Sequence, residues 1–413
     1  MIHIDPLRFN ADGHWYTSYP SLNHWTEDFT HEDYVNELNK FKGPLHLYLH
    51  IPFCAKLCSY CICNVVISNN REKIQFFLDH LLKEIDLLKP FKPNITSIHF
   101  GGGTPSHLDR AQFSQLCAKL NEIAPLRYMK EVAMEIDPRT VNQDDLRHYA
   151  SEGVTRISFG IQDFNLKVQE AINRVQPPEM IENLLEARDV FEGVNFDLLY
   201  GLPHQTMETF KDTLERTIEM GPERITLLKY CHAPEIRKHM KLIKREDLPD
   251  PALLPRMFQM GVEMLTNPKG PGYIKIGMDH FAARGDSLHE AVCRTLETSR
   301  RGYLKRTFNG YSPNTQEMIG LGPTSTGVLG DIYCQSHYDL NEYYAAINRG
   351  EFPILRGYHM TEDDHKRRDV IFDFLCGRLV TLDREYFSEE WEKLSEMPDL
   401  CKMNFWGYED MVN

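Results

Sequence analysis

Residues 45–63 read LHLYLHIPFCAKLCSYCIC, which joins an apolar run directly to a cysteine-rich loop. Residues 45–51 predict a buried β-strand, because a run of this length and composition is typical of a sheet interior. Cys54, Cys58 and Cys61 follow with C-x3-C-x2-C spacing, and Cys63 comes two positions later. In a chain without a secretion signal, such a cluster indicates metal binding or redox chemistry.

The alternation of strand and helix continues from this stretch to about residue 230. Six strands are predicted, beginning near residues 45, 97, 131, 156, 195 and 224, and helix-like sequence follows each of them. Residues 71–88, for example, place apolar side chains at the spacing of one helix face. The alternation predicts an α/β fold with a parallel sheet, either a partly closed (β/α) barrel or a doubly wound sheet.

Polar and glycine residues recur where the predicted strands end. They are Cys54, residues 101–104, Glu135, Gln162 and Asp197. Ligands of parallel α/β folds bind at the carboxyl ends of the strands. We therefore expect one shared site to which most of the strands contribute.

Three regions are expected along the 413 residues. Residues 1–44 predict an ordered N-terminal arm, residues 45–350 the barrel with its extension, and residues 351–413 a small, mainly helical C-terminal domain. The extension includes a predicted helix over residues 252–266 and a predicted strand over residues 273–277.

The overall charge limits the choice of partners. The chain has 46 Lys and Arg against 60 Asp and Glu, a net charge of −14. This excess of acid argues against nucleic acid as the main partner, because phosphate neutralisation needs surplus Lys and Arg. The first residues do not resemble a secretion signal, and no apolar window is long enough for a membrane span. We therefore expect a cytoplasmic chain.

The cysteine loop has two chemical interpretations. A zinc site usually combines two cysteine hooks or adds histidines, and the sequence has no second hook. Three thiolates on one loop would instead hold three irons of a [4Fe–4S] cluster and leave the fourth iron open to a ligand. Zinc binding and chance clustering stay as alternatives, but the position of the loop after a strand favours the iron–sulfur cluster.

Together with the glycine-rich sequence GGGTP at 101–105, the cysteine loop resembles the radical S-adenosylmethionine (SAM) enzymes. Further segments resemble the oxygen-independent coproporphyrinogen III oxidase family over about residues 14–376. These segments are YTSYP at 16–20, HIPFC at 50–54, CICN at 61–64, GIQDF at 160–164, NR at 173–174, DLLYGLP at 197–203 and GMDHFA at 277–282.

The resemblance implies a partial (β/α)6 radical SAM barrel with an N-terminal arm and a C-terminal helical domain. It also implies conversion of two propionate side chains of coproporphyrinogen III to vinyl groups in haem biosynthesis. No amino-acid side chain can remove hydrogen from such a carbon, so a cofactor must supply the radical. The implied cofactors are a [4Fe–4S] cluster on Cys54, Cys58 and Cys61 and two SAM molecules. An electron donor such as a flavodoxin or ferredoxin, a tetrapyrrole substrate and a monomeric state are also implied.

The resemblance assigns SAM-binding roles to residues that would each have an ordinary explanation alone, such as a helix cap or a surface ion pair. Their recurrence at strand ends favours the ligand roles. They are Tyr48, Gly102, Gly103, Thr104, Glu135, Gln162, Arg174 and Asp197. Tyr48 and Cys63 are also candidates for contacts near the radical, although Cys63 is equally explained as a small packing residue.

The chain departs from the family pattern in the region of the second SAM. Cys231 stands at an alanine position and Thr326 at an isoleucine position, and Pro323 removes a backbone N–H. The arm reads HWY at 14–16 without the usual basic residue, and Asn413 ends the sequence before the usual C-terminal domain would. We expect Cys231 and Thr326 to alter binding of the second SAM, unless both are neutral packing changes.

Two other functions are open at this stage. A related radical SAM enzyme could transfer a methyl group, form a cyclopropane or open a porphyrin ring with two SAM molecules. A haem- or cluster-binding chaperone without turnover belongs to a different class. The complete set of residues expected to hold the first SAM argues against the chaperone.

Overall fold

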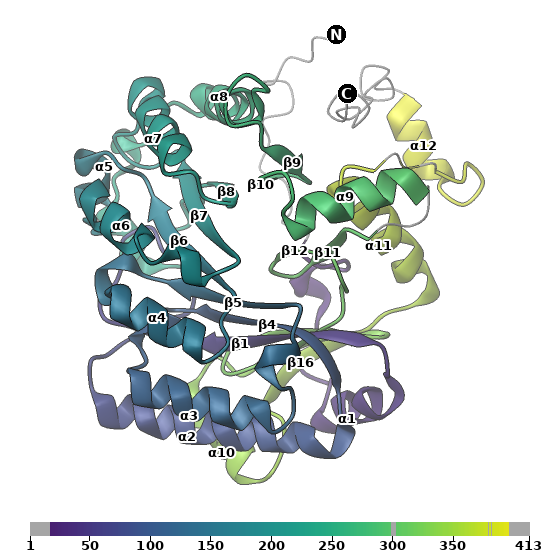
Figure 1. The fold of residues 1–413 in the computed structure, drawn as a ribbon. Helices are drawn as coiled ribbons and strands as arrows, with labels where there is room; N and C mark the ends of the chain where they lie inside the picture. Colours follow the sequence, from purple (N-terminus) through teal and green to yellow (C-terminus); the bar gives the residue numbers. More distant parts are fainter. Residues whose placement is uncertain (1–16, 299–302, 379, 381, 396–413) are drawn as a thin grey trace.

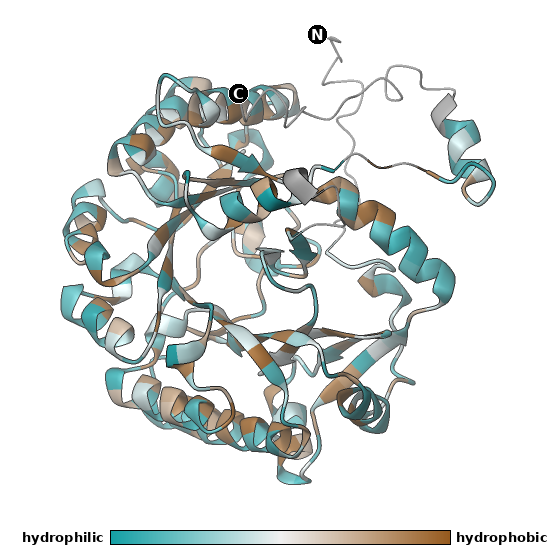
Figure 2. Ribbon diagram, turned by 45° about the vertical axis from the view of Figure 1, so that its right-hand side comes forward, coloured by the Kyte–Doolittle hydropathy of each residue, from teal (hydrophilic) through white to brown (hydrophobic). Residues whose placement is uncertain are grey.

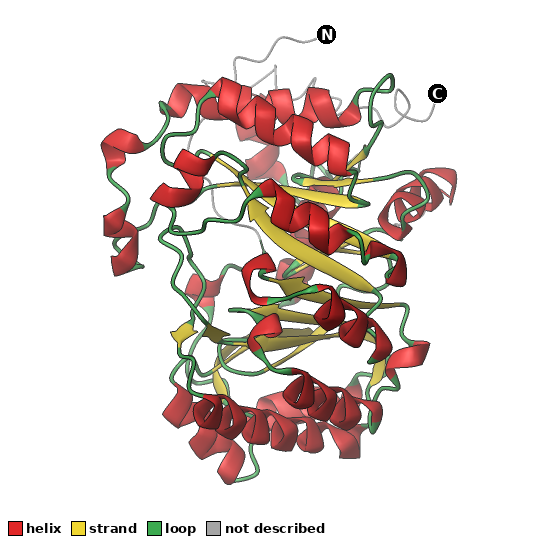
Figure 3. Ribbon diagram, turned by 60° about the vertical axis from the view of Figure 1, so that its left-hand side comes forward, coloured by secondary structure: helices red, strands yellow, loops and turns green. Residues whose placement is uncertain are grey.

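The computed structural model describes residues 17–298, 303–378, 380 and 382–395. In this part of the chain a curved sheet of twelve strands forms the centre, and helices cover its outer face (Figures 1 and 3). The expected motif residues 14–16 and the residues from 396 to Asn413 lie outside the described residues.

The six predicted parallel strands are confirmed, and they lie side by side in chain order. They are β1 (Pro44–Ile51), β4 (Asn94–Gly102), β5 (Glu131–Ile136), β6 (Arg156–Gln162), β7 (Gly193–Tyr200) and β8 (Arg224–Lys229). Every neighbouring pair in this series is parallel. The arrangement is the partial (β/α)6 barrel, not the doubly wound sheet.

Helices cover the outside of these strands. They are α2 (Arg71–Leu88), α3 (Arg110–Asn121), α4 (Gln143–Ser151), α5 (Leu166–Ala171), α6 (Pro178–Leu185), α7 (Met207–Met220) and α8 (Leu254–Thr266). Local signals set their ends: α3 begins with a capping box between Asp109 and Gln112, and α7 ends at Gly221 in the left-handed conformation. Figure 2 shows hydrophobic residues on the helix faces toward the sheet and hydrophilic residues outside.

Short strands extend the sheet at both edges, and the sequence analysis predicted only one of them. Beside β1 lie β13 (Met318–Leu321), which is parallel to it, and then β14 (Thr326–Leu329), β15 (Ile332–Ser336) and β16 (Ile354–His359). Beside β8 lie the antiparallel strands β10 (His280–Ala282) and β9 (Ile274–Ile276), the second of which was predicted. Strands of three to six residues are too short to show a clear alternation.

Four more short strands and two further helices belong to the barrel region, and a third helix belongs to the N-terminal arm. The strands are β2 (Phe53–Cys54), β3 (Val66–Ile67), β11 (Lys305–Thr307) and β12 (Gly310–Ser312). Two of the helices are α9 (Ser287–Thr298) and α10 (Leu340–Asn348), and the third, α1 (His31–Lys40), belongs to the N-terminal arm.

The described part of the arm packs on the added strands. Trp25 stacks on Tyr333 of β15 with ring centroids 5.2 Å apart, and Thr26 forms a β-bridge with Gly357 of β16. Beyond residue 351 the expected helical content is present as α11 (Glu362–Leu375) and α12 (Ser388–Ser395), but β16 precedes it and pairs with β15. No helix in the described residues has the length and apolar character that crossing a membrane requires.

Candidate active site

A large cavity of about 1710 Å³ occupies the inside of the curved sheet. All six parallel strands contribute to its lining, together with the cysteine loop. The strands β9 to β12 and the end of α11 form the wall opposite that loop. The structure therefore joins the predicted strand-end residues into one site.

The strands line this cavity with polar side chains because their residues alternate between two faces. On β7, Val194, Phe196 and Leu198 are fully buried toward the helices, whereas Asn195 and Asp197 line the cavity. Strand register brings equivalent positions together, so that Ser158 lies between Glu135 and Asn195 on adjacent strands. The polar residues His46, Ser97, His99, Glu135, Ser158, Asn195, Asp197 and Thr226 line the cavity in this way.

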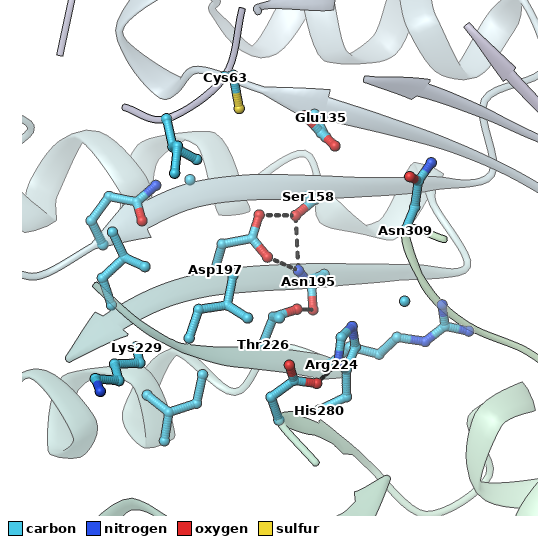
Figure 4. A pocket seen from close by; sticks show the side chains of 18 of the residues that line it. Cys63, Glu135, Ser158, Asn195, Asp197, Arg224, Thr226, Lys229, His280 and Asn309 are labelled. Atoms are coloured by element: carbon cyan, nitrogen blue, oxygen red, sulfur yellow. Dashed lines mark hydrogen bonds and ion pairs between the residues drawn. The ribbon is translucent and has the colours of Figure 1, made fainter. Parts of the chain in front are cut away.

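Asp197 is held in a hydrogen-bond network with its neighbours on the sheet (Figure 4). Ser158 Oγ donates to one carboxylate oxygen at 2.8 Å, and Asn195 Nδ2 donates to the other at 2.8 Å. Burial raises the pKa of Asp197 above its usual value, and the nearby Glu135 carboxylate adds to this effect. Asp197 is thus a fixed acceptor, oriented toward the cavity for a ligand that donates hydrogen bonds.

Glu135 makes a second polar pair one strand away. Its Oε1 lies 3.0 Å from Nε2 of His99 on β4, and the Tyr48 ring stacks on His99 at a centroid distance of 5.8 Å. Burial opposes charge on His99, but the hydrogen bond and charge of Glu135 outweigh it and raise the His99 pKa. This pair gives the cavity wall both a carboxylate and a histidine that favours the charged form.

The cysteine loop lies against the glycine-rich end of β4. Thr104 Oγ1 donates to Sγ of Cys54 at 3.2 Å. A side chain at Gly103 would put a Cβ 2.6 Å from the carbonyl oxygen of Pro52 and 3.0 Å from the Cys54 sulfur, so only glycine fits there. The GGGTP and cysteine segments, which we expected to share one site, therefore pack closely against each other through their backbones.

The NR motif fixes the middle of the cysteine loop. Asn173 Nδ2 donates to the carbonyl oxygen of Leu57 at 2.8 Å, and Ser59 N donates to Ile172 O at 2.9 Å. Arg174 is buried and directs Nη1 toward Sγ of Cys58 at 3.7 Å, while Nη2 donates to the carbonyl oxygen of Gly160 at 2.8 Å. The motif thus ties the loop to the end of β6.

A second guanidinium also faces Cys58. Arg139 Nη2 lies 3.5 Å from Sγ of Cys58, and both Arg139 and Arg174 pair with Asp137. Positive charge beside a cysteine favours the thiolate, which is the form that binds metals. The two arginines therefore suit a loop whose sulfurs act as ligands.

Cys61 and Cys63 are hydrogen-bonded to each other. This bond lowers the pKa of Cys61 to about 7 and is the main cause that raises the pKa of Cys63 well above its usual value. The hydrogen bond therefore favours the thiolate on Cys61 over a thiolate on Cys63. The Cys63 side chain is exposed to the cavity and points into it beside Glu135 (Figure 4).

The donor set of the loop fits an iron–sulfur cluster. Cys54, Cys58 and Cys61 line the same end of the cavity, and their sulfurs are contacted by Thr104, Arg139 and Cys63, respectively. In the part of the chain that the structure describes, no three His, Cys, Asp or Glu side chains are grouped tightly enough for a metal ion. A [4Fe–4S] cluster with one open iron takes three Cys ligands, which is the number that the C-x3-C-x2-C loop supplies.

Comparison with known proteins agrees with this chemistry. The model of the radical SAM superfamily matches residues 48–217. Oxygen-independent coproporphyrinogen III oxidase from Escherichia coli strain K12 is 37% identical over 391 residues, which are 93% of this chain and 83% of the relative. The Helicobacter pylori strain 26695 enzyme of the same name is 33% identical over 430 residues, covering 97% and 91%.

A solved structure agrees with both relatives. The E. coli coproporphyrinogen III oxidase structure, described as a radical SAM enzyme, superposes with a TM-score of 0.85 at 36% identity. The superposition covers 93% of this chain and 90% of that one. The chain belongs to the oxygen-independent coproporphyrinogen III oxidase family. The resemblance drawn from the sequence motifs is thereby confirmed, and the chain is a radical SAM oxidoreductase.

Most of the residues assigned by the family resemblance line the cavity of this family member. They are Cys54, Cys58, Cys61, Cys63, Gly102, Gly103, Thr104, Glu135, Gln162, Arg174, Asp197 and Cys231. Gln162 reaches the cavity from a bulge at the end of β6, where its backbone is left-handed with φ 67°.

Two assigned residues do not line the cavity. Tyr48 lies beside His99 on the neighbouring strand, stacks on its ring and places its hydroxyl 3.2 Å from Nδ1 of His50. Thr326 is buried on β14, which is separated from β1 by β13. Its contact with a ligand in this cavity has no support in the geometry.

The sequence analysis missed the polar residues in the interior of the strands. His99, Ser158, Asn195 and Thr226 line the cavity from positions before the strand ends. Their signal was present as polar residues alternating with apolar ones on β6 and β7. Such alternation indicates a strand with one polar face. The sequence analysis considered polar residues only where the strands end.

The wall opposite the cysteine loop contains the GMDHFA motif. His280 Nδ1 lies 2.7 Å from Asp279 Oδ1, and the His280 ring contacts Tyr311 edge-on at 5.1 Å. The guanidinium of Arg306 lies over the Tyr311 ring at 5.0 Å. Burial lowers the pKa of Lys275 to about 8. This wall therefore carries basic and aromatic side chains together with one carboxylate, Asp279, which pairs with His280.

Proposed function

We propose that the chain removes two propionate carboxylates of coproporphyrinogen III as carbon dioxide and leaves vinyl groups. The relatives that share its fold and most of its length carry the name of this activity. The observation that carries the proposal is the cavity of about 1710 Å³ between the cysteine loop and a basic wall. Pockets for drug-sized ligands span about 300–1,000 Å³, so this one has room for a tetrapyrrole beside a nucleoside cofactor.

The residues near the cysteine loop would hold the cofactors. Cys54, Cys58 and Cys61 would bind a [4Fe–4S] cluster, which together with SAM supplies the radical that removes hydrogen from a propionate carbon. Backbone groups at Gly102 and Gly103 can approach the methionyl end of SAM closely because no side chain intervenes. Asp197 is positioned to accept hydrogen bonds from hydroxyl groups of a bound nucleoside.

The basic wall would hold the substrate. Coproporphyrinogen III carries four propionates, and their carboxylates need cationic or hydrogen-bonding partners when they leave water. Arg306, Lys275 and His280 line this wall, and Lys229 lines the cavity from the end of β8. A substrate with some of its propionates held there could present a remaining propionate toward the cysteine loop across the cavity.

Anaerobic turnover with coproporphyrinogen III, SAM, dithionite and an electron acceptor tests this function. Each propionate should lose one hydrogen atom, one carbon dioxide and one electron, so two carbon dioxide molecules should appear per vinyl-bearing product. The Cys54→Ala variant should give none. A methylated, cyclopropanated or ring-opened product would instead establish the related radical SAM reaction, and binding of haem without any turnover would establish a chaperone.

The remaining properties follow from the same proposal. We expect two SAM molecules per chain, a monomer, a cytoplasmic location and a flavodoxin or ferredoxin as electron donor. Equilibrium dialysis of SAM and sedimentation analysis of the reconstituted protein measure the first two.

A further inference from the structure

Residues 237–245, RKHMKLIKR, form a basic segment on an acidic protein. These nine residues contain five Arg and Lys and no Asp or Glu, whereas the whole chain has a net charge of −14. The segment follows β8 and includes a short 3-10 helix, Lys238–Leu242. Such a local reversal of charge can attract an acidic partner that the rest of the surface repels.

The basic segment is attached to the cysteine loop by two hydrogen bonds. Arg237 Nε donates to the carbonyl oxygen of Ile62 at 2.7 Å. His239 Nε2 lies 2.7 Å from the carbonyl oxygen of Cys61. The segment therefore touches the loop at a proposed cluster ligand and at the residue after it.

Apolar anchors fix which side of the segment faces outward. Met240 and Ile243 are buried in a small hydrophobic cluster against which Tyr60 and Ile62 of the cysteine loop also pack. The two residues between them, Lys241 and Leu242, are exposed. Leu242 is 75% exposed and Ile236, just before the segment, is 69% exposed.

The lysines of the segment are exposed beside these apolar residues. Lys238, Lys241 and Lys244 are all exposed, and none of them forms an ion pair within the described residues. Arg245 pairs with Glu235 at 3.4 Å on the same exposed surface. Exposed Glu235 and Glu246 flank the segment, so its five Arg and Lys still exceed the nearby acidic side chains. Exposed lysines that form no ion pair, interspersed with exposed apolar side chains, are typical of a surface that binds a partner.

We infer that the basic segment docks a small acidic protein that carries single electrons, and that it does so beside the cysteine loop. The inference rests on the cluster in the proposed function but not on its substrate. Electron transfer weakens steeply with distance, so a carrier seated on a segment bonded to Cys61 has a short path. One electron leaves the reduced carrier and one enters the cluster, with no bond formed or broken.

Reduction of the reconstituted full-length protein by flavodoxin hydroquinone tests the inference. The probe variant is K238E/K241E/K244E. The control variant, K73E/K83E/K269E, has the same change in charge at exposed lysines outside the segment. At low ionic strength the second-order rate of reduction should fall at least about tenfold in the probe variant and much less in the control. The difference should shrink as salt screens the charges.

Two measurements do not depend on turnover. Carbodiimide cross-linking of oxidised flavodoxin to the wild-type protein should join its carboxylates to Lys238, Lys241 or Lys244. Dithionite, which needs no docking surface, should reduce wild type and both variants equally. Failure of dithionite to reduce the wild type would overturn the cluster and this inference together.

Equal slowing in the probe and control variants would overturn the docking surface alone. So would cross-links that map elsewhere. Co-sedimentation of wild type but not the probe variant with phosphatidylserine vesicles, combined with unchanged flavodoxin rates, would show that the segment is a membrane-binding surface instead.

Discussion

The guanidinium group of Arg174 lies 3.7 Å from the sulfur of Cys58, although 116 residues separate them in the chain. Arg174 also donates to the carbonyl oxygen of Gly160, where any larger residue would place a Cβ 2.9 Å from Nη2. One side chain thus joins the end of β6 to the proposed cluster ligand. If Arg174 also holds SAM, as the family resemblance implies, then SAM binding and cluster binding should be coupled at this position.

Replacing Arg174 by Ala should weaken both functions. Loss of hydrogen bonds to charged groups costs about 1.5–3 kcal/mol, which corresponds to a loss of SAM affinity of roughly tenfold or more. Because Cys58 loses a guanidinium neighbour, iron should also be lost faster to a chelator. Equilibrium dialysis with SAM and timed iron release measure the two effects. Arg147→Ala removes an exposed ion pair with Asp144 as control, and equality of the two variants would refute the assignment.

The iron and sulfide content of alanine variants distinguishes the three predicted ligands from Cys63. Alanine at Cys54, Cys58 or Cys61 should reduce bound iron and sulfide severely after anaerobic reconstitution, because each removes one corner ligand. Cys63→Ala should keep a cluster, since the hydrogen bond between the two cysteines favours the thiolate on Cys61 over a thiolate on Cys63. Cys117→Ala, at a buried site on α3, controls for misfolding. Loss of the cluster in Cys63→Ala with retention in Cys61→Ala would mean that the ligand set is wrong.

The sequence predicted the parallel strands and the strand-end residues well, because both depend on local patterns. The local sequence alone was enough to predict a strand over residues 45–51 and a helix over residues 71–88. The role of Asn173 and Arg174 in holding Leu57 and Cys58 required the tertiary fold, since no local pattern joins residues so far apart. Strands β13 to β16 were missed because each has only four to six residues, too few to show a clear alternation.

Glu84 predicts a pH dependence of stability. This buried residue on α2 accepts hydrogen bonds from Gly322 N at 2.8 Å and from Tyr343 Oη at 2.6 Å. Burial outweighs both bonds and raises its pKa from 4.5 to about 7. Between these pH values the unfolded carboxyl loses its proton while the folded one keeps it. Glu84 therefore supports the fold below about pH 4.5, and this support is lost as the pH rises through about 7.

Glu84→Gln keeps an acceptor for both donors and cannot ionise. At pH 8 we expect the variant to unfold at a higher urea concentration than wild type, because its free energy of unfolding is greater by up to about 3 kcal/mol. At pH 5 we expect little difference between the two proteins. Glu72→Gln, at an exposed position on the same helix, should match wild type at both values. A variant that is equally destabilised at pH 5 and pH 8 would contradict this account of Glu84.

Asp197→Ala should lower SAM affinity by roughly tenfold or more, because it removes a fixed charged acceptor from the cavity wall. Its partners Ser158 and Asn195 would keep each other, since Asn195 Nδ2 also donates to Ser158 Oγ at 2.8 Å. Iron content should therefore stay at the wild-type level, unlike in Arg174→Ala. Asp189→Ala serves as an exposed control in the 3-10 helix Arg188–Val190. Unchanged SAM binding would place the nucleoside elsewhere in the cavity.

The departures from the family at Cys231 and Thr326 should now behave differently from each other. Cys231 lines the cavity after β8, so Cys231→Ala should change the number or affinity of bound SAM molecules. Thr326 is 4% exposed within β14 and outside that lining, so Thr326→Ile should leave SAM stoichiometry unchanged. Isoleucine replaces the hydroxyl of Thr326 with a larger apolar group, which must fit into a packed sheet. Such overpacking costs about 1–3 kcal/mol of stability. Equilibrium dialysis and urea denaturation of both single variants separate these effects. If Thr326→Ile altered SAM stoichiometry while Cys231→Ala did not, a second SAM would have to lie nearer β14 than the cavity allows.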